Sequence, residues 1–135
     1  MDLTRVFPRS PYDMLAGLVM LPRTVDKVRA RQRDALGEYI YPCPLDEILL
    51  GFLGLDGDEL VALVNRADDD NALEELLARR APRTIEERNA FNNKMRHLVP
   101  QDEEGRQWLA AKQDELARRD YFTYFDQLDA EEGRF

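Results

Sequence analysis

Signals that begin or end a helix recur at short intervals along this chain. Thr84 followed by Glu87 has the spacing of a capping box, and Asp56 followed by Glu59 repeats it. Gly54 follows the most apolar segment of the sequence, where a glycine typically ends a helix. Because each signal closes one helix or opens the next, they predict a chain of short helices.

The spacing of apolar residues between these signals is also helical. Apolar side chains recur at intervals of three and four residues, as one buried helix face requires. Only residues 38–41 have a strand-like composition, and this stretch is too short to form a sheet alone. The predicted helices cover residues 11–20, 25–35, 45–53, 57–67, 68–81, 85–98 and 102–119.

We therefore expect an all-α fold, a single-domain bundle of seven or eight short helices over residues 1–135. The segment 45–53 is the predicted central helix, with the core around Ile48, Leu49, Phe52 and Leu53. The helix over 25–35 carries a thin apolar stripe and many charges, so we expect it on the surface. The last residues, 130–135, are expected to fray.

Composition excludes several classes of protein. The 135 residues carry a net charge of −8, which disfavours nucleic-acid binding by bulk charge. No apolar run reaches the roughly 18 residues of a membrane span, and the amino end lacks a signal-peptide pattern. The single cysteine cannot form an internal disulfide, so we expect a cytoplasmic location. One Cys and one His cannot build a zinc site, no calcium loop or phosphate loop is present, and we expect no metal or cofactor.

Three stretches, taken in order, resemble a known family. They are Asp2–Thr4 with Pro8–Pro11, then Leu21–Ala30, then Gly37–Asp46, with looser similarity at Ala81–Thr84 and Gly105–Trp108. The pattern is similar to that of a bacterial family named as a domain of unknown function, DUF5069. The resemblance implies a small, mostly helical bacterial protein and carries no activity with it. The residue before the cysteine is often Asn in that family and is Pro42 here, so this chain lacks a side-chain amide at that position.

The amino-terminal part of the chain is locally basic. Residues 1–42 hold seven basic and five acidic side chains, in contrast to the acidic remainder. Arg23 and Lys27 lie near a predicted helix start, and a helix N-terminus with added cations favours an anion. We therefore predict a non-catalytic binding module for a small anionic ligand or an acidic peptide, with both cations facing solvent. The predicted ligand-binding residues are Arg23, Asp26, Lys27, Tyr39, Tyr41, Cys43 and Asp46.

Other interpretations of the same residues stay open. The charges between Arg23 and Arg33 also fit a solvated helix face with weak ion pairs. Cys43 precedes a predicted helix start, which favours a reactive thiol and an enzyme that uses it, although a free cysteine is more often a small buried side chain. Tyr39 and Tyr41 share one side of an extended segment and more often pack a loop on the core than line a pocket. A third alternative is a protein whose acidic surface binds a protein partner.

Overall fold

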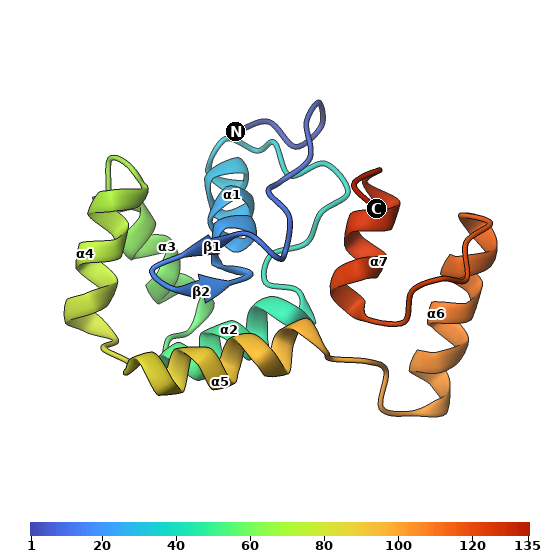
Figure 1. Ribbon diagram of the computed structural model, residues 1–135. Coiled ribbons are helices and arrows are strands. Elements are labelled where there is room, and N and C mark those ends of the chain that lie inside the picture. The colour runs from blue at the N-terminus through green and yellow to red at the C-terminus, as the bar shows by residue number, and fades with distance from the viewer.

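The computed structural model describes all 135 residues and contains seven helices and one two-stranded hairpin (Figure 1). The fold is therefore mostly helical, with a small antiparallel sheet that the all-α prediction lacks. None of the helices combines the length and apolar character needed to cross a membrane. The elements are β1 (Met14–Leu15), β2 (Leu18–Val19), α1 (Leu21–Gln32), α2 (Pro44–Leu53), α3 (Gly57–Arg66), α4 (Asp70–Arg80), α5 (Ile85–Arg96), α6 (Glu103–Glu115) and α7 (Tyr124–Glu131).

The capping signals begin the helices that they predict. Asp56 accepts a hydrogen bond from the backbone N–H of Glu59 at 2.8 Å, and the Glu59 carboxylate accepts from the Asp56 N–H in return. Thr84 and Glu87 form the same reciprocal pair at the start of α5. Gly54 ends α2 with a φ of 68°, a conformation that glycine adopts without a steric penalty. These predictions are confirmed.

Residues 11–20 do not form the predicted helix. Met14 pairs with Val19 and Leu15 with Leu18 in an antiparallel hairpin. The two residues of its turn, Ala16 and Gly17, have φ values of 53° and 73°, as a tight hairpin turn requires. The helix prediction is wrong here although the apolar residues have helical spacing. Gly17 supplies a turn between the two strands, and β2 is buried and contacts α5.

α1 has more buried residues than any other helix, although the sequence predicts it on the surface. Nine of its twelve residues are buried. Three of these carry charge: Arg23, Asp26 and Lys27. The surface prediction is wrong because groups from distant segments pair with these charges, which removes most of the cost of burying them.

One hydrophobic cluster of 20 buried residues joins the hairpin, helices α1 to α5 and one residue of α7. Leu49 and Leu53 of the predicted centre are buried in it. Ile48 and Phe52 are only half-buried and pack against its edge, with the Phe52 ring stacked on Phe91 at 4.5 Å. The core thus draws on the hairpin and on helices α1 to α5 rather than on one face of α2 alone.

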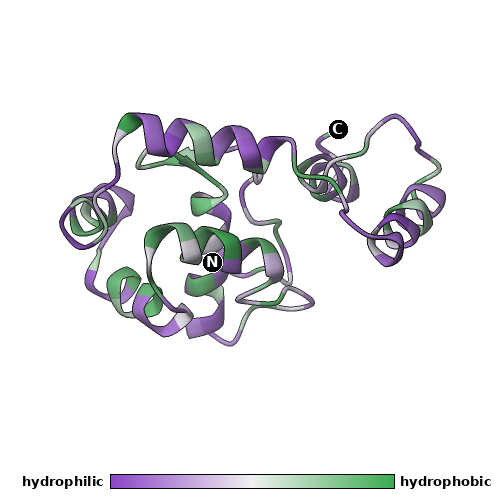
Figure 2. Cartoon of the chain, turned by 90° about the horizontal axis from the view of Figure 1, so that it is seen from below, coloured by the Kyte–Doolittle hydropathy of each residue, from purple (hydrophilic) through white to green (hydrophobic).

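α6 and α7 lie to one side of the other helices (Figures 1 and 2) and share a small second cluster of Leu109, Tyr121 and Ala130. α7 reaches the main cluster through Phe125, whose ring meets Tyr12 edge-on at 5.1 Å. The predicted fraying of 130–135 is wrong at Ala130 and Glu132, which are buried. Charged contacts described below hold this end of the chain against α1.

Candidate functional site

The predicted site residues gather around α1, but both cations are buried and paired. The Arg23 side chain is 2% exposed, and its guanidinium donates to both carboxylate oxygens of Glu132 at 2.9 and 2.7 Å. The Lys27 side chain is 3% exposed, and its ammonium lies 2.5 Å from the Asp46 carboxylate. The prediction that Arg23 and Lys27 face solvent is therefore wrong. Their counterions come from distant positions in the sequence, which local charge spacing cannot reveal.

Glu132 also binds Tyr39. The Tyr39 hydroxyl donates to the Glu132 carboxylate at 2.7 Å, and the Arg23 guanidinium lies 5.5 Å from the centre of the Tyr39 ring. Burial alone would raise the pKa of Glu132, but the hydrogen bonds and charge of Arg23 outweigh it and hold the pKa below its ordinary value. Burial and the neighbouring carboxylate raise the pKa of Tyr39, so this tyrosine stays a neutral donor.

A second cluster joins Lys27, Asp46 and Cys43. The Lys27 ammonium donates to the Ile40 carbonyl at 3.1 Å and lies 3.3 Å from the Cys43 sulfur. Asp46 accepts from the Thr24 hydroxyl at 2.6 Å and from the Cys43 N–H at 2.9 Å, which caps α2. Cys43 is half-buried, at the N-cap of α2 and beside a buried ammonium. A cation and a helix start both increase the reactivity of a thiol.

Asp26 and Tyr41 belong to neither cluster. Asp26 accepts from the backbone N–H of Arg9 at 2.9 Å and from its guanidinium at 3.1 Å. The Tyr41 hydroxyl donates to the carbonyl of Gly57 in α3 at 2.7 Å. Tyr39 therefore bonds to Glu132, directly after α7, and Tyr41 bonds to α3. Tyr41 packs in the main hydrophobic cluster, in line with the interpretation that these tyrosines pack a loop on the core. The extended segment with both rings on one side is not formed, because residues 38–41 form a turn and loop.

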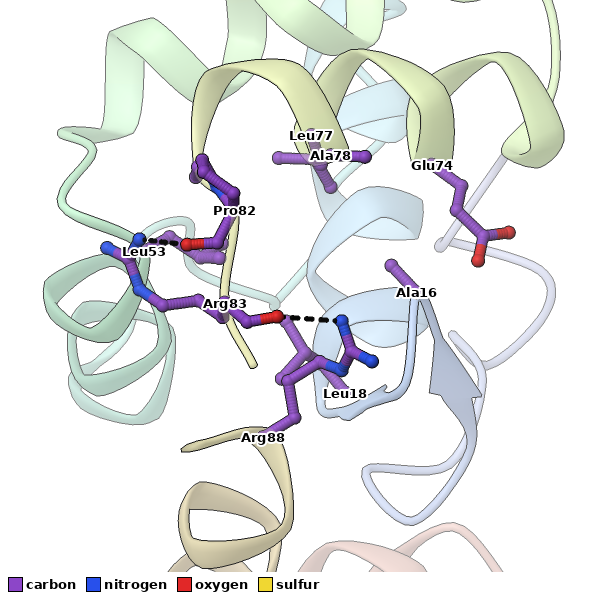
Figure 3. A pocket seen from close by; sticks show the side chains of 10 residues that line it. Ala16, Leu18, Leu53, Glu74, Leu77, Ala78, Pro82, Arg83 and Arg88 are labelled. Atoms are coloured by element: carbon purple, nitrogen blue, oxygen red, sulfur yellow. Dashed lines mark hydrogen bonds between the residues drawn. The ribbon is translucent and has the colours of Figure 1, made fainter. Parts of the chain in front are cut away.

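The structure places a pocket elsewhere, where the hairpin meets α2, α4 and the start of α5 (Figure 3). Its volume is about 170 Å³. Its apolar wall consists of Ala16, Leu18, Leu53, Leu77, Ala78 and Ala81. Small side chains from α4 and the hairpin leave the space that larger residues would fill.

Three charged residues border this pocket, and none of them has an ionic partner. Arg83 donates to the carbonyls of Phe52 and Pro82 at 3.0 and 2.7 Å, and Arg88 donates to the Arg83 carbonyl at 3.0 Å. No carboxylate pairs with either guanidinium, and no cation pairs with Glu74. The pocket thus combines an apolar wall with charges that lack an ionic partner, although two backbone carbonyls hold the Arg83 guanidinium over the Phe52 ring, 5.6 Å from its centre.

The hairpin turn leaves room for one of these guanidiniums. A Cβ atom at Gly17 would lie 2.9 Å from Nε of Arg88, closer than side chains approach one another. The same glycine has a φ of 73°, which a residue with a side chain rarely adopts. Gly17 therefore serves the turn and the position of Arg88 together. No group of three or more His, Cys, Asp or Glu side chains in the chain is placed to hold a metal ion.

The model of one protein family, described as Domain of unknown function (DUF5069), matches residues 5–134. The chain belongs to this family. The match confirms the resemblance carried by the sequence motifs, and its description assigns no activity to DUF5069. No curated protein matches the sequence.

Sequence reasoning missed the pocket residues of this DUF5069 protein. Glu74, Arg83 and Arg88 come from three successive segments, and Gly17 comes from a segment predicted as helix. Only Arg83 falls within a stretch that supports the resemblance, Ala81–Thr84. No local spacing marks the others, because the pocket forms only where the hairpin, which is distant in the sequence, lies beside α4 and the start of α5. The ligand-binding role of the residues predicted around α1 stays a prediction.

Proposed function

We propose that this protein is a non-catalytic binding module for a small anionic ligand, which it binds in the pocket between the hairpin, α4 and α5. The observation that carries the proposal is the Arg88 guanidinium, which lacks a carboxylate partner beside an apolar wall. Arg83 borders the same pocket and also lacks a carboxylate partner, although two backbone carbonyls accept from it. Arginine binds carboxylate or phosphate through two parallel hydrogen bonds. The ligand class is the one predicted from the sequence, but the place differs, because the two cations predicted to bind it, Arg23 and Lys27, are already paired.

The volume of the pocket limits the size of its ligand. A cavity of about 150 Å³ in another protein holds one benzene molecule, so a pocket of 170 Å³ takes a molecule of similar size. This supports a ligand with one anionic group and a short apolar chain. A nucleotide or an extended peptide is too large to enter it, although part of a larger molecule fits.

A titration with isocaproate, a branched short-chain carboxylate, tests the proposal by calorimetry and by amide chemical-shift mapping. We expect shifts around the pocket and a loss of affinity of about tenfold in Arg88→Gln and in Arg83→Gln. Arg79→Gln is the matched control, since Arg79 is exposed on α4 and does not line the pocket. Ala78→Leu adds apolar volume to the pocket and should prevent binding. Shifts outside the pocket, or equal affinity in all variants, would refute the proposal.

A second candidate is an enzyme that uses Cys43 as a nucleophile. The observation in its favour is the buried Lys27 ammonium 3.3 Å from the sulfur, at the start of α2. Neither the pocket nor the Glu132 cluster supplies Cys43 with a substrate site. We therefore rank this candidate second, and the rate at which the folded protein's Cys43 is alkylated tests it. No specific contact in the structure favours the third alternative, an acidic surface that binds a protein partner.

A further inference from the structure

We infer that Lys27 and Cys43 form an oxidative modification site, where hydrogen peroxide causes the lysine nitrogen and the cysteine sulfur to join through a covalent S–N bond. This inference goes beyond the proposed function and does not depend on the ligand pocket. It rests on a pair of side chains that the fold brings into contact, and not on the cysteine alone.

The two reacting atoms are in contact although their residues are distant in the sequence. Nζ of Lys27 lies 3.3 Å from Sγ of Cys43, and 16 positions separate the two residues. The same ammonium donates to the Ile40 carbonyl at 3.1 Å and to the Asp46 carboxylate at 2.5 Å. These two acceptors hold the nitrogen beside the sulfur, so the nucleophile is already in place when the sulfur is oxidised.

Burial favours reaction within the pair. The Lys27 side chain is 3% exposed, which keeps its nitrogen away from solvent. Cys43 is half-buried, so a molecule as small as hydrogen peroxide reaches its sulfur more easily than a second protein chain does. The chain has no other cysteine, and an oxidised Cys43 therefore cannot form an internal disulfide.

The reaction takes place in two steps. The Cys43 thiolate first attacks one oxygen of hydrogen peroxide, the O–O bond breaks, and the sulfur becomes a sulfenic acid. The hydroxide released in this step takes a proton from the Lys27 ammonium, which gives water and a neutral amine. The amine nitrogen then attacks the sulfur, an S–N bond forms, and the S–O bond breaks as the hydroxyl leaves with an amine proton as a second water. The sulfur loses two electrons overall, and one peroxide is reduced to two waters.

The bond converts a charged contact into a neutral covalent link between α1 and the start of α2. Its nitrogen carries no positive charge, so the buried Asp46 carboxylate loses the cation that compensates it. A thiol reductant cleaves an S–N bond of this kind and restores both side chains. The pair therefore has the chemistry of a reversible redox switch.

Peptide mapping of the protein after treatment with a slight excess of hydrogen peroxide tests the inference. Trypsin places a modified Lys27 in the peptide of residues 24–29 and Cys43 in the peptide of residues 34–66. We expect the intact chain to lose about 2 Da and these two peptides to appear as one joined species. Dithiothreitol should separate them and restore the original mass.

Lys27→Arg is the matched variant, because it keeps a cation beside the sulfur but has no amine that can attack it. This variant should give no joined peptides and should instead gain about 16 or 32 Da, as sulfenic or sulfinic acid. Lys112→Arg changes a lysine of α6 and should crosslink as the wild type does. The wild-type chain unfolded in urea should give no joined peptides, which keeps the inference testable even if Lys27→Arg does not fold.

Several results would overturn the inference. One is a folded wild type that only gains oxygen or forms a disulfide-linked dimer. Another is a joined species that contains Lys94 or Lys112 in place of Lys27, or that also forms in Lys27→Arg. A joined species heavier by about 14 Da than the sum expected for two unmodified peptides would mean that an oxygen atom separates nitrogen from sulfur, and the direct S–N bond would be wrong.

Discussion

Arg23 and Glu132 form a bidentate ion pair although 109 positions separate them in the sequence. Their side chains are 2% and 4% exposed. This pair ties the end of the chain to the helix with the most buried residues. It also explains why the Arg23 guanidinium is not free to bind a ligand.

Arg23→Met should destabilise the protein by about 3–5 kcal/mol, because it leaves the Glu132 carboxylate buried without its main partner. Urea unfolding followed by circular dichroism measures this. Arg5→Met is the matched control, since the Arg5 side chain is 85% exposed in its ion pair with Asp2, and it should cost less than about 0.5 kcal/mol. Equal effects of the two variants would contradict the structural role of the buried pair.

Stability should fall in acid partly through Glu132. The pKa of this carboxyl is below its ordinary value of 4.5 in the folded protein, so the unfolded chain binds its proton first as the pH falls. The stabilisation is complete above the unfolded value and is lost as the pH falls through the folded value. Glu132→Gln should therefore be less stable than wild type at about pH 7, and the gap should narrow at about pH 3. A gap that stays constant between these pH values would show that Glu132 does not titrate as proposed.

Local signals in the sequence were sufficient for most helix boundaries. The capping pairs Asp56–Glu59 and Thr84–Glu87 act within one helical turn, so neighbouring residues in the sequence are enough to predict them. The hairpin could not be predicted from neighbouring residues in this way. Its turn depends on Ala16 and Gly17 taking positive φ, and the burial of β2 depends on α5, which lies far along the chain.

The prediction that Arg23 and Lys27 face solvent was wrong for a related reason. The spacing of Arg23 and Lys27 identified two residues of structural importance, but it could not show that Glu132 and Asp46 neutralise them. The charges left without a counterion, such as Arg88, are recognisable only when all pairs in the fold are known. Long-range pairing therefore decided which cations are structural and which are free.

Gly17→Ala should affect stability and binding together. A side chain at a φ of 73° is strained, and its Cβ would lie 2.9 Å from Nε of Arg88, so the guanidinium must move. We expect a loss of about 1–2 kcal/mol in unfolding free energy and weaker binding of isocaproate. Gly51→Ala is the matched control. Nothing lies near an added Cβ at Gly51, and alanine in the middle of α2 should stabilise the protein by about 0.5–1 kcal/mol without changing binding. If Gly17→Ala bound isocaproate with unchanged affinity, Arg88 would not be part of the binding site.

The reactivity of Cys43 tests the enzyme alternative. The half-buried thiol lies beside the Lys27 ammonium and at the start of α2, and both features increase the reactivity of a cysteine. If they act together, iodoacetamide should modify Cys43 about threefold faster, or more, in the folded protein than in the chain unfolded by urea at the same pH. Mass spectrometry follows the reaction, and Cys43→Ser gives its blank because the chain has no other cysteine. A slower reaction in the folded protein would mean that packing protects the thiol, and the enzyme alternative would lose the one contact that favours it.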